Sequence, residues 1–378
     1  MDVLGGSGER ALLEAARRGD GAAFGQLVEP HRAGLHAHCY RMLGSVQDAE
    51  DALQEALLGA WRGLAGFEGR SSLRSWLYRI ATNACLRLLA ERPRRLLAAD
   101  HGPAAAPRDP LGEPLLESAW VEPYPDQRLG LEDGFAAPEA RYELRESVEL
   151  AFVAALQHLP ASQRAVLILR EVLGFSAAEV AASLGTTVAS VNSALQRARR
   201  AVDARVPARS QQATLRSLGA DGLRQLVEGF VAAWERADVD AIVGMLAEDA
   251  RFTMPPLPSW FAGRDDIGVF LAERVFATPW RFVPVRANGQ PAFACYQGEP
   301  GGGRFRLGAL DVLTLRGRQV LEITSFLDPR AYEPFASGPT GERRSAPQAV
   351  RPKAARSRAC ASASGGVRGR GPTAPAPR

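Results

Sequence analysis

The sequence predicts a multidomain protein in which two all-α domains precede a C-terminal α+β domain. Its 378 residues, 46% of them hydrophobic, are enough for two or three packed domains. Apolar residues recur at helical spacing in residues 8–92 and again in 139–206. From about 218 to 335, two amphipathic helices are followed by alternating patterns typical of strands, at 281–287, 304–316 and 319–327.

Two further segments separate and follow these domains. Residues 93–138 hold eight prolines, which regular helix does not tolerate, so a linker is expected there. Residues 338–378 hold nine basic residues against one acid and are rich in Ala, Gly, Pro and Ser. We expect a disordered basic tail, because such a segment buries too little apolar surface to fold. The tail contributes +8 to the net charge of +4, so its basicity is no evidence that the folded part binds DNA.

Cysteine usage and hydropathy predict a cytoplasmic protein without a membrane segment. Cys39, Cys85, Cys295 and Cys360 are far apart and share no C-x-x-C spacing, so neither a disulfide framework nor a zinc site is indicated. There is no apolar run of about 18 residues and no signal-peptide core.

A histidine cluster in residues 31–39 is the only other arrangement that suggests a metal. It contains His31, His36, His38 and Cys39, but helical metal ligands need i, i+3 or i+4 spacing, which these residues meet only in part. We expect the cluster to pack against neighbouring helices and predict no metal or cofactor.

The segment 162–200 carries the strongest functional signal. Ser176 begins a short helix that Gly185 ends, and a second helix follows a two-residue loop. One face of the second helix is apolar, and the other carries Asn192, Ser193, Gln196, Arg197, Arg199 and Arg200. Such a polar face suits the major groove, with arginines near phosphates, so a DNA-binding helix-turn-helix is predicted. A helical hairpin with a solvated face is the alternative.

The helix expected at 47–62 has one acidic face. Asp48, Asp51, Gln54, Glu55 and Leu58 lie opposite its apolar positions. This face suits docking on a basic helical partner, and also plain solvation, which the residues alone favour.

The loop after that helix comprises Phe67, Glu68, Gly69, Arg70, Ser71 and Ser72, and it leads into a helix that mixes aromatic and basic residues. Aromatic surfaces and cations together suit single-stranded DNA. Trp76 is equally explained as a core residue.

Together these segments resemble a bacterial sigma factor of the extracytoplasmic-function (ECF) group of the sigma-70 family. The resemblance covers about residues 8–205 and rests on DAEDALQEALLGAWR, FEGRSSLRSWLYRIATNACL and LPASQRAVLILREVLGFSAAEVAASLGTTVASVNSALQRAR. It implies that 8–92 is region 2, a helical bundle that binds core RNA polymerase and the −10 element. It implies that 139–206 is region 4, a helix-turn-helix that binds the −35 element.

The resemblance also assigns roles to single residues. It implies that Asp51, Gln54 and Glu55, with Leu58 beside them, contact the clamp coiled coil of the polymerase. Region 4 is expected to bind the flap of the polymerase. Capture of a flipped −10 base passes to the loop Phe67–Ser72 and to Asn83. Recognition of −35 bases passes to Asn192, Ser193, Gln196 and Arg197, and phosphate contact to Arg199 and Arg200. Relatives often carry Arg or Lys at the position of Asn192, and Asn pairs best with adenine, so a different −35 sequence is expected.

The linker segment 118–130 looks like a subgroup signature of ECF sigma factors with an extra C-terminal domain. Its Trp120, Glu122, Tyr124 and Asp126 form either an anchoring motif or a pin that holds a proline-rich linker to the protein surface. Both interpretations stay open at this stage.

Residues 218–335 resemble the SnoaL-like (polyketide-cyclase-like) cone, an α+β barrel. The fold hosts enzymes and inert binding modules alike. No histidine follows His158, which excludes a histidine-based mechanism, and the acids Asp249, Asp266 and Asp311 remain. For Asp249 a capping or turn role is expected. We expect an autoregulatory module without catalytic residues, with a small apolar ligand near Trp234, Met254, Trp260 and Phe326, or with these side chains as ordinary core.

The predicted function is that of a sigma factor that binds core RNA polymerase and promoter DNA and directs initiation, modulated by its C-terminal domain. An anti-sigma protein or a small ligand of that domain are further candidate partners. The alternative is a ligand-responsive helix-turn-helix regulator that acts without core polymerase. A third reading is an enzyme whose cone performs the chemistry.

Overall fold

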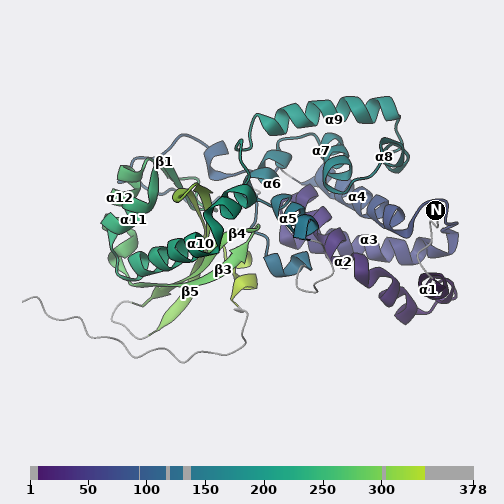
Figure 1. The fold of residues 1–378 in the computed structure, drawn as a ribbon, viewed down its shortest axis with the longest axis horizontal. Helices are drawn as coiled ribbons and strands as arrows, with labels where there is room; N and C mark the ends of the chain where they lie inside the picture. The colour runs from purple at the N-terminus through teal and green to yellow at the C-terminus, as the bar shows by residue number, and fades with distance from the viewer. Residues whose placement is uncertain (1–6, 93, 116–119, 131–137, 300–303, 337–378) are drawn as a thin grey trace, which may run out of the picture. The chain divides into compact units, whose positions relative to one another are not determined.

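The computed structural model describes residues 7–92, 94–115, 120–130, 138–299 and 304–336. The expected basic tail at 338–378 lies outside them. Within the described part, none of the helices combines the length and apolar character needed to cross a membrane. The predicted fold class is confirmed: two helical domains are followed by an α+β domain around one six-stranded sheet (Figure 1).

The first helical domain consists of four helices, of which the second, third and fourth begin at side-chain caps. Asp20 caps the second helix, Ser45 the third and Ser72 the fourth, and Gly44 ends the second in the left-handed conformation. Helices α2, α3 and α4 pack on one another around buried Leu, Ala and aromatic side chains. The helices are α1 (Ser7–Arg17), α2 (Gly21–Leu43), α3 (Val46–Gly63) and α4 (Leu73–Glu91), with the 3₁₀ turn η1 (Leu64–Gly66) after α3.

The second helical domain contains the predicted helix-turn-helix. Ser176 and Glu179 form a capping box at the start of α8, and Gly185 ends α8 at φ 62°, as the sequence predicts. Thr187 then caps α9. The elements are α5 (Pro138–Glu146), α6 (Leu150–Gln157), α7 (Ala161–Leu167), the π-helical turn η4 (Ile168–Val172), α8 (Ala177–Leu184) and α9 (Val188–Asp203).

The linker contributes two short 3₁₀ turns, η2 (Ala98–Asp100) and η3 (Asp126–Leu129). Its remaining described residues are irregular, as the prolines predict.

The C-terminal domain, called the cone domain below, is a curved sheet of order β2-β1-β6-β5-β4-β3. All neighbouring strands are antiparallel except β1 and β6. The strands are β1 (Leu246–Thr253), β2 (Trp260–Ala262), β3 (Trp280–Ala287), β4 (Gln290–Gly298), β5 (Phe305–Arg316) and β6 (Gln319–Phe326). The helices are α10 (Gln211–Glu235), α11 (Val239–Met245), α12 (Arg264–Glu273) and α13 (Pro329–Tyr332), with turns η5 (Val275–Ala277) and η6 (Glu333–Phe335).

The sheet is buried on both faces, which decides how the domains are joined. Leu313 and Ile323 belong to the cone's own core, which α10, α11 and α12 cover. Leu310 and Val312 face the other way and share one apolar core with the helical domains. Strand alternation therefore commits one face of the sheet to contact with the rest of the chain.

Candidate functional site

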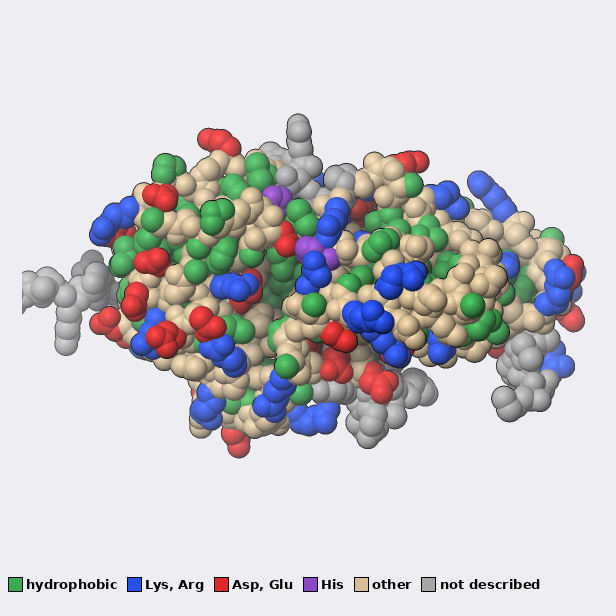
Figure 2. All heavy atoms as spheres, turned by 90° about the horizontal axis from the view of Figure 1, so that it is seen from above, with side chains coloured by type: hydrophobic (Ala, Val, Ile, Leu, Met, Phe, Trp, Pro, Cys, Tyr) green, Lys and Arg blue, Asp and Glu red, His purple; other side chains and the backbone are tan. Residues whose placement is uncertain are grey.

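The predicted recognition face of α9 is fully open to solvent. Asn192, Ser193, Gln196, Arg197 and Arg200 are all exposed, while the apolar side of the helix is buried. Figure 2, viewed from the side on which α9 lies in Figure 1, shows arginine side chains gathered over this part of the molecule. Arg199 is also exposed but pairs with Glu171 at 2.7 Å. The structure thus brings all six predicted residues onto one helix, five of them without an ion pair within the described part of the chain.

On α3 the structure separates the acidic residues that the sequence placed together. Asp51, Gln54 and Glu55 are exposed, and Leu58 is 55% exposed, although Glu55 also pairs with Arg87 of α4 at 2.5 Å. Asp48 is buried, so its expected place on the exposed face was wrong. It lies near the N-terminal end of α3 beside Arg92 and Arg95, and the Arg95–Asp48 distance is 2.5 Å.

The loop between α3 and α4 presents only part of its predicted residues. Phe67 is buried, with its ring centroid 4.9 Å from that of Trp76, so it supports the loop from beneath. Glu68 pairs with Arg70 at 3.1 Å on the exposed side, and Asn83 of α4 is exposed. Trp76 is buried, so of the two roles that its sequence position allowed it takes that of a core residue.

Helix α4 also packs against the second helical domain, which the sequence did not predict. The Ser75 hydroxyl donates to Glu179 of α8 at 3.1 Å. Arg74 donates to the Leu173 carbonyl at 3.0 Å, and its guanidinium lies 4.5 Å from the ring centroid of Phe175. The first and second helical domains are therefore in direct contact.

Two buried arginines strengthen this contact from α2 and α7. Arg41 of α2 donates to the Ser147 hydroxyl at 2.7 Å and to the Ser147 carbonyl at 3.1 Å. Arg164 of α7 donates to the Met42 carbonyl and to Gln157 Oε1, the latter at 2.6 Å. Burial lowers the pKa of Arg164 to about 10. A buried cation keeps its partners only in one geometry, so these bonds fix how the two helical domains dock.

The β3–β4 hairpin is inserted between the two helical domains and the linker. Its tip is Asn288-Gly289, with φ of 55° and 69°, the left-handed geometry that a two-residue hairpin turn needs. Asn288 is completely buried and donates from Nδ2 to the Tyr40 hydroxyl at 2.8 Å and to the Val148 carbonyl at 2.7 Å. Its Oδ1 accepts from the Tyr124 backbone N–H at 2.8 Å. One amide therefore bonds to α2, to the linker and to the residues just before α6.

A second polar bridge joins the second helical domain to α10. Glu149 is buried and accepts from the backbone N–H groups of Gln211 and Gln212, at 2.9 and 2.7 Å. These groups lie in the first turn of α10, where backbone donors are free for a carboxylate. Burial nevertheless raises the pKa of Glu149 to about 7.

The segment 120–130 pins the linker to both neighbours. Glu122 accepts from the Val46 N–H at 3.0 Å and from Arg95 at 3.2 Å. Asp126 accepts from the Gly289 N–H at 2.7 Å, and Tyr124 is fully buried. Of the two interpretations left open by the sequence, the pin is the one that these contacts show.

The earlier part of the linker lies along the cone domain. The Ala105 N–H donates to the Trp260 carbonyl at 2.8 Å, and the Trp260 indole N–H donates back to the Gly102 carbonyl at 2.9 Å. Arg108 pairs with Glu273 of α12 at 2.5 Å, and Leu111 packs against the cone's core.

The three acids that the sequence singled out in the cone domain lie on different elements. Asp249 lies within β1, not in a turn as expected, and it is exposed and paired with Arg316 at 3.1 Å. Asp266 is exposed in the first turn of α12. Asp311 is buried beside Ser325 and Cys295, and burial raises its pKa to about 6.

The side chains suggested for an apolar ligand are divided between two cores. Trp234 and Met254 pack in the cone's core, whereas Phe326 faces the helical domains. Trp260 is half-buried and bonds to the linker as described above.

The histidines of α2 make specific contacts inside the protein. His36 Nδ1 lies 2.8 Å from the Tyr124 hydroxyl, and His38 Nε2 lies 2.9 Å from the Thr82 hydroxyl. Burial is the main cause that lowers their pKa values to about 4 and about 3. The expectation that they pack against neighbouring elements is confirmed.

A capped helix-turn-helix with an open polar face, joined to a helical bundle, is the architecture of a DNA-binding protein. Comparisons with known proteins make this specific. Residues 27–95 match the family model Sigma-70 region 2, residues 149–202 match Sigma-70, region 4, and residues 227–323 match the SnoaL-like domain.

The most informative similarity is to the ECF RNA polymerase sigma factor SigG of Mycobacterium tuberculosis (strain ATCC 25618 / H37Rv). It is 42% identical over 332 residues and covers 84% of each chain. The ECF RNA polymerase sigma-E factor of Escherichia coli (strain K12) is 32% identical over 198 residues, which are 52% of this chain and 94% of that protein. The crystal structure of the Mycobacterium tuberculosis ECF sigma factor SigJ has a similar fold, with a TM-score of 0.51 and 21% identity over 80% of this chain and 95% of that one.

The chain therefore belongs to the ECF RNA polymerase sigma factors. As such it binds core RNA polymerase and promoter DNA and directs the initiation of transcription. No finding favours the alternative of a regulator that acts without the polymerase.

Proposed function

We propose that this sigma factor is closed when free, and that its cone domain holds the two helical domains together until core polymerase binds. In the open form, α3 docks on the polymerase clamp through Asp51, Gln54, Glu55 and Leu58. The loop 67–72 and Asn83 capture a −10 base, with Phe67 acting from below as support. The open face of α9 reads the −35 element through the six residues named above.

The distance between the two promoter elements supports a closed form of the free protein. The −10 and −35 elements are about 25 base pairs apart, or roughly 85 Å at 3.4 Å per base pair. Helix α4, to which we assign −10 recognition, touches α8 of the helix-turn-helix through the Ser75–Glu179 bond of 3.1 Å. A molecule of this shape cannot reach both elements at once, so α4 and α8 must separate for initiation.

The observation that carries the proposal is the placement of Asn288. Its side chain bonds at once to Tyr40, to the Tyr124 backbone and to the Val148 carbonyl. Opening the molecule breaks these bonds and exposes the Leu310 and Val312 face of the sheet. The buried hydrogen bonds and the buried apolar surface both stabilise the closed form. Opening therefore requires a compensating interaction. Binding to the polymerase supplies one.

We further propose that the cone domain acts by contact rather than by catalysis. Of the three acids singled out from the sequence, Asp311 is enclosed with Ser325 and Cys295, Asp249 pairs with Arg316, and Asp266 is exposed. The proposal places the protein in the cytoplasm, where the bacterial polymerase works. A separate anti-sigma protein stays a prediction.

Run-off transcription tests the proposal. The full chain is added to sigma-free core polymerase on a fragment library from a GC-rich bacterial genome, and transcript ends are sequenced. Discrete starts should appear only with the protein present, and should disappear when Gln54→Ala and Glu55→Arg are combined. The number of transcripts should rise when Asn288→Asp opens the molecule. Unchanged transcription in Asn288→Asp, although the closed form is destabilised, would contradict the role of the cone domain.

A further inference from the structure

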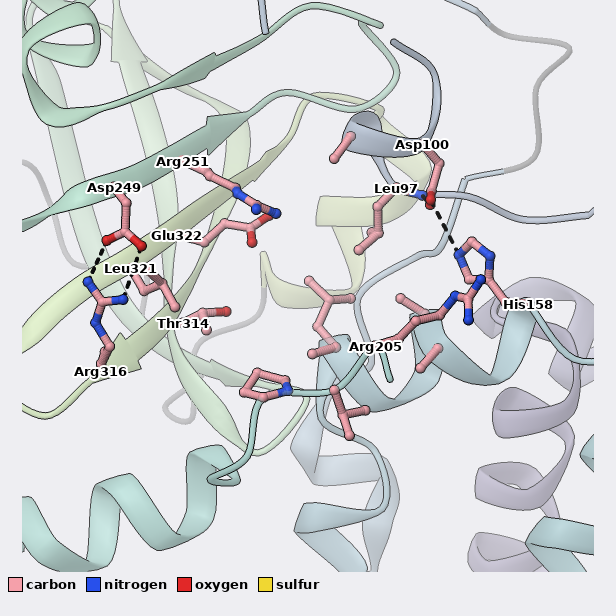
Figure 3. A pocket seen from close by; sticks show the side chains of 17 residues that line it. Leu97, Asp100, His158, Arg205, Asp249, Arg251, Thr314, Arg316, Leu321 and Glu322 are labelled. Carbon is pink, nitrogen blue, oxygen red and sulfur yellow. Dashed lines mark hydrogen bonds and ion pairs between the residues drawn. The ribbon is translucent and has the colours of Figure 1, made fainter. Parts of the chain in front are cut away.

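A cavity of about 430 Å³ lies where the linker, the second helical domain and the cone domain meet (Figure 3). None of the residues proposed above for polymerase or DNA binding lines it. Its lining comprises Leu97, Ala99, Asp100, Leu150, Ala151, Ala154, Ala155, His158, Arg205, Val206, Pro207, Asp249, Arg251, Thr314, Arg316, Leu321 and Glu322.

One side of the cavity is apolar. Ala151, Ala154 and Ala155 recur at i, i+3 and i+4, so α6 presents a strip of small side chains along the cavity. Val206 and Pro207, which follow α9, and Leu321 of β6 extend this surface. Such a strip of small side chains leaves room for the apolar part of a small ligand.

The polar side of the cavity carries basic side chains that differ in their partners. Arg316 pairs with Asp249, and His158 lies 3.4 Å from Asp100. Within the described part of the chain, neither Arg205 nor Arg251 has a carboxylate oxygen within ion-pair distance. Arg205 donates to the Ala201 carbonyl at 3.2 Å, and Arg251 lies 5.7 Å from the ring centroid of Trp260.

Figure 3 shows how these two arginines are placed. Arg251 lies beside Glu322 on the cone side, and Arg205 lies beside His158 on the opposite side, with the cavity between them. Burial raises the pKa of the Glu322 carboxyl, and the positive charge of Arg251 partly opposes this rise. Guanidinium groups with spare N–H donors above an apolar strip match the chemistry of an organic carboxylate.

We infer that this cavity binds a small organic carboxylate with an apolar body, which lies between Arg251 and Arg205 on opposite sides of the cavity and packs its body along α6. The walls come from three parts of the chain that meet only in the closed form. A ligand that binds one form alone stabilises that form by mass action. The ligand therefore acts as a corepressor, a consequence that rests on the closed form proposed above.

The test uses the full chain and defined probes. Decanoate, below its micelle concentration, and 4-phenylbutyrate are titrated by calorimetry, and decanamide and decylamine serve as neutral and cationic matches of decanoate. The variants are Arg251→Met, Arg205→Met and Ala151→Leu, the last of which fills the apolar strip. Arg264→Met, at an exposed position of α12 outside the cavity, is the matched control. Circular dichroism checks that each variant is folded.

The expected result is saturable, one-to-one binding of the carboxylates, with decanamide and decylamine at least tenfold weaker. Affinity should fall about tenfold in Arg251→Met and Arg205→Met, should fall in Ala151→Leu, and should be unchanged in Arg264→Met. No saturable binding, or equal binding to the three cavity variants, overturns the site. Decanoate should also lower run-off transcription. Binding without that effect overturns the corepressor role alone, whereas the effect of Asn288→Asp tests the closed form independently.

Discussion

Asn288 donates a hydrogen bond to the hydroxyl of Tyr40 over 2.8 Å, although 248 positions separate the two residues in the sequence. Tyr40 in turn donates to the Glu122 carbonyl of the linker at 2.7 Å. A hairpin of the cone domain, a helix of region 2 and the linker are thus connected through two side chains. Both side chains are completely buried, so water does not replace these bonds while the molecule is closed.

Asn288→Asp should open the molecule. The new carboxylate keeps the size of the amide but loses the two N–H donors, so it faces the Val148 carbonyl and the Tyr40 oxygen as an acceptor. We expect a loss of about 2–4 kcal/mol in the stability of the closed form. Run-off transcription should rise several-fold, and hydrogen exchange should speed up around Val148. Gln297→Glu, an exposed amide-to-acid change on β4, is the control that should change neither.

Leu58→Asp should weaken binding to core polymerase without destabilising the protein. Leu58 is 55% exposed, so its replacement removes little buried area from the folded chain. At an interface centre the same change removes an apolar contact and buries a charge, which typically costs more than 2 kcal/mol. Binding to core polymerase by interferometry measures this. Val283→Asp, at an exposed apolar position of the cone domain, serves as control, and equal losses in both variants would contradict the role of α3.

On α9, Gln196→Ala and Arg200→Ala should weaken binding to promoter DNA in different ways. Loss of a base-reading side chain should weaken the preferred −35 sequence by about 1–3 kcal/mol and relax discrimination at one base pair. Loss of a phosphate contact should weaken all sequences alike and lower the salt dependence of binding by about one unit of slope. Titration of open complexes at several salt concentrations separates the two. Equal weakening at all −35 sequences in Gln196→Ala would assign that residue to the DNA backbone instead.

The stability of the closed form should depend on Glu149 between about pH 8 and 6.5. Its pKa is raised to about 7 in the fold, above its usual value near 4.5, so the folded form binds the proton more tightly. Its contribution to the free energy of unfolding therefore increases as the pH falls through 7 and is lost as the pH rises. Below about 6.5, His36 and His38 oppose this trend, because their lowered pKa values leave them neutral in the fold while the unfolded chain takes up protons.

Urea unfolding at several pH values checks this prediction. In Glu149→Gln the pH dependence between 8 and 6.5 should flatten, whereas the exposed Glu143→Gln should behave as the original chain. An identical pH dependence in Glu149→Gln and the original chain would show that another group is responsible.

Local chemistry made much of the fold predictable from sequence. Ser176 and Gly185 mark the ends of α8 because capping and left-handed termination depend on neighbouring residues alone. Strand alternation located β3, β5 and β6 within a residue at each end. The same local reasoning placed six polar residues on one face of α9, all of which are exposed.

What the sequence did not predict depends on contacts between distant segments. Asp48 looks solvent-facing on a helical wheel, yet Arg95 from the linker covers it. Phe67 sits in a polar loop, and only the packing of Trp76 explains why it turns inward. Asn288-Gly289 carries the signature of a hairpin turn, which indicates the turn but not that its tip is buried between region 2, the linker and region 4.

The distance between α4 and α8 tests the central claim most directly. Spin labels at Arg79 and Ala182, both exposed, would report it by pulsed electron resonance once Cys360 is replaced by Ser, since Cys39, Cys85 and Cys295 are buried. We predict one short distance in the free chain and an increase of several tens of ångströms when core polymerase and promoter DNA are added. An unchanged short distance in a complex that initiates transcription would contradict the account.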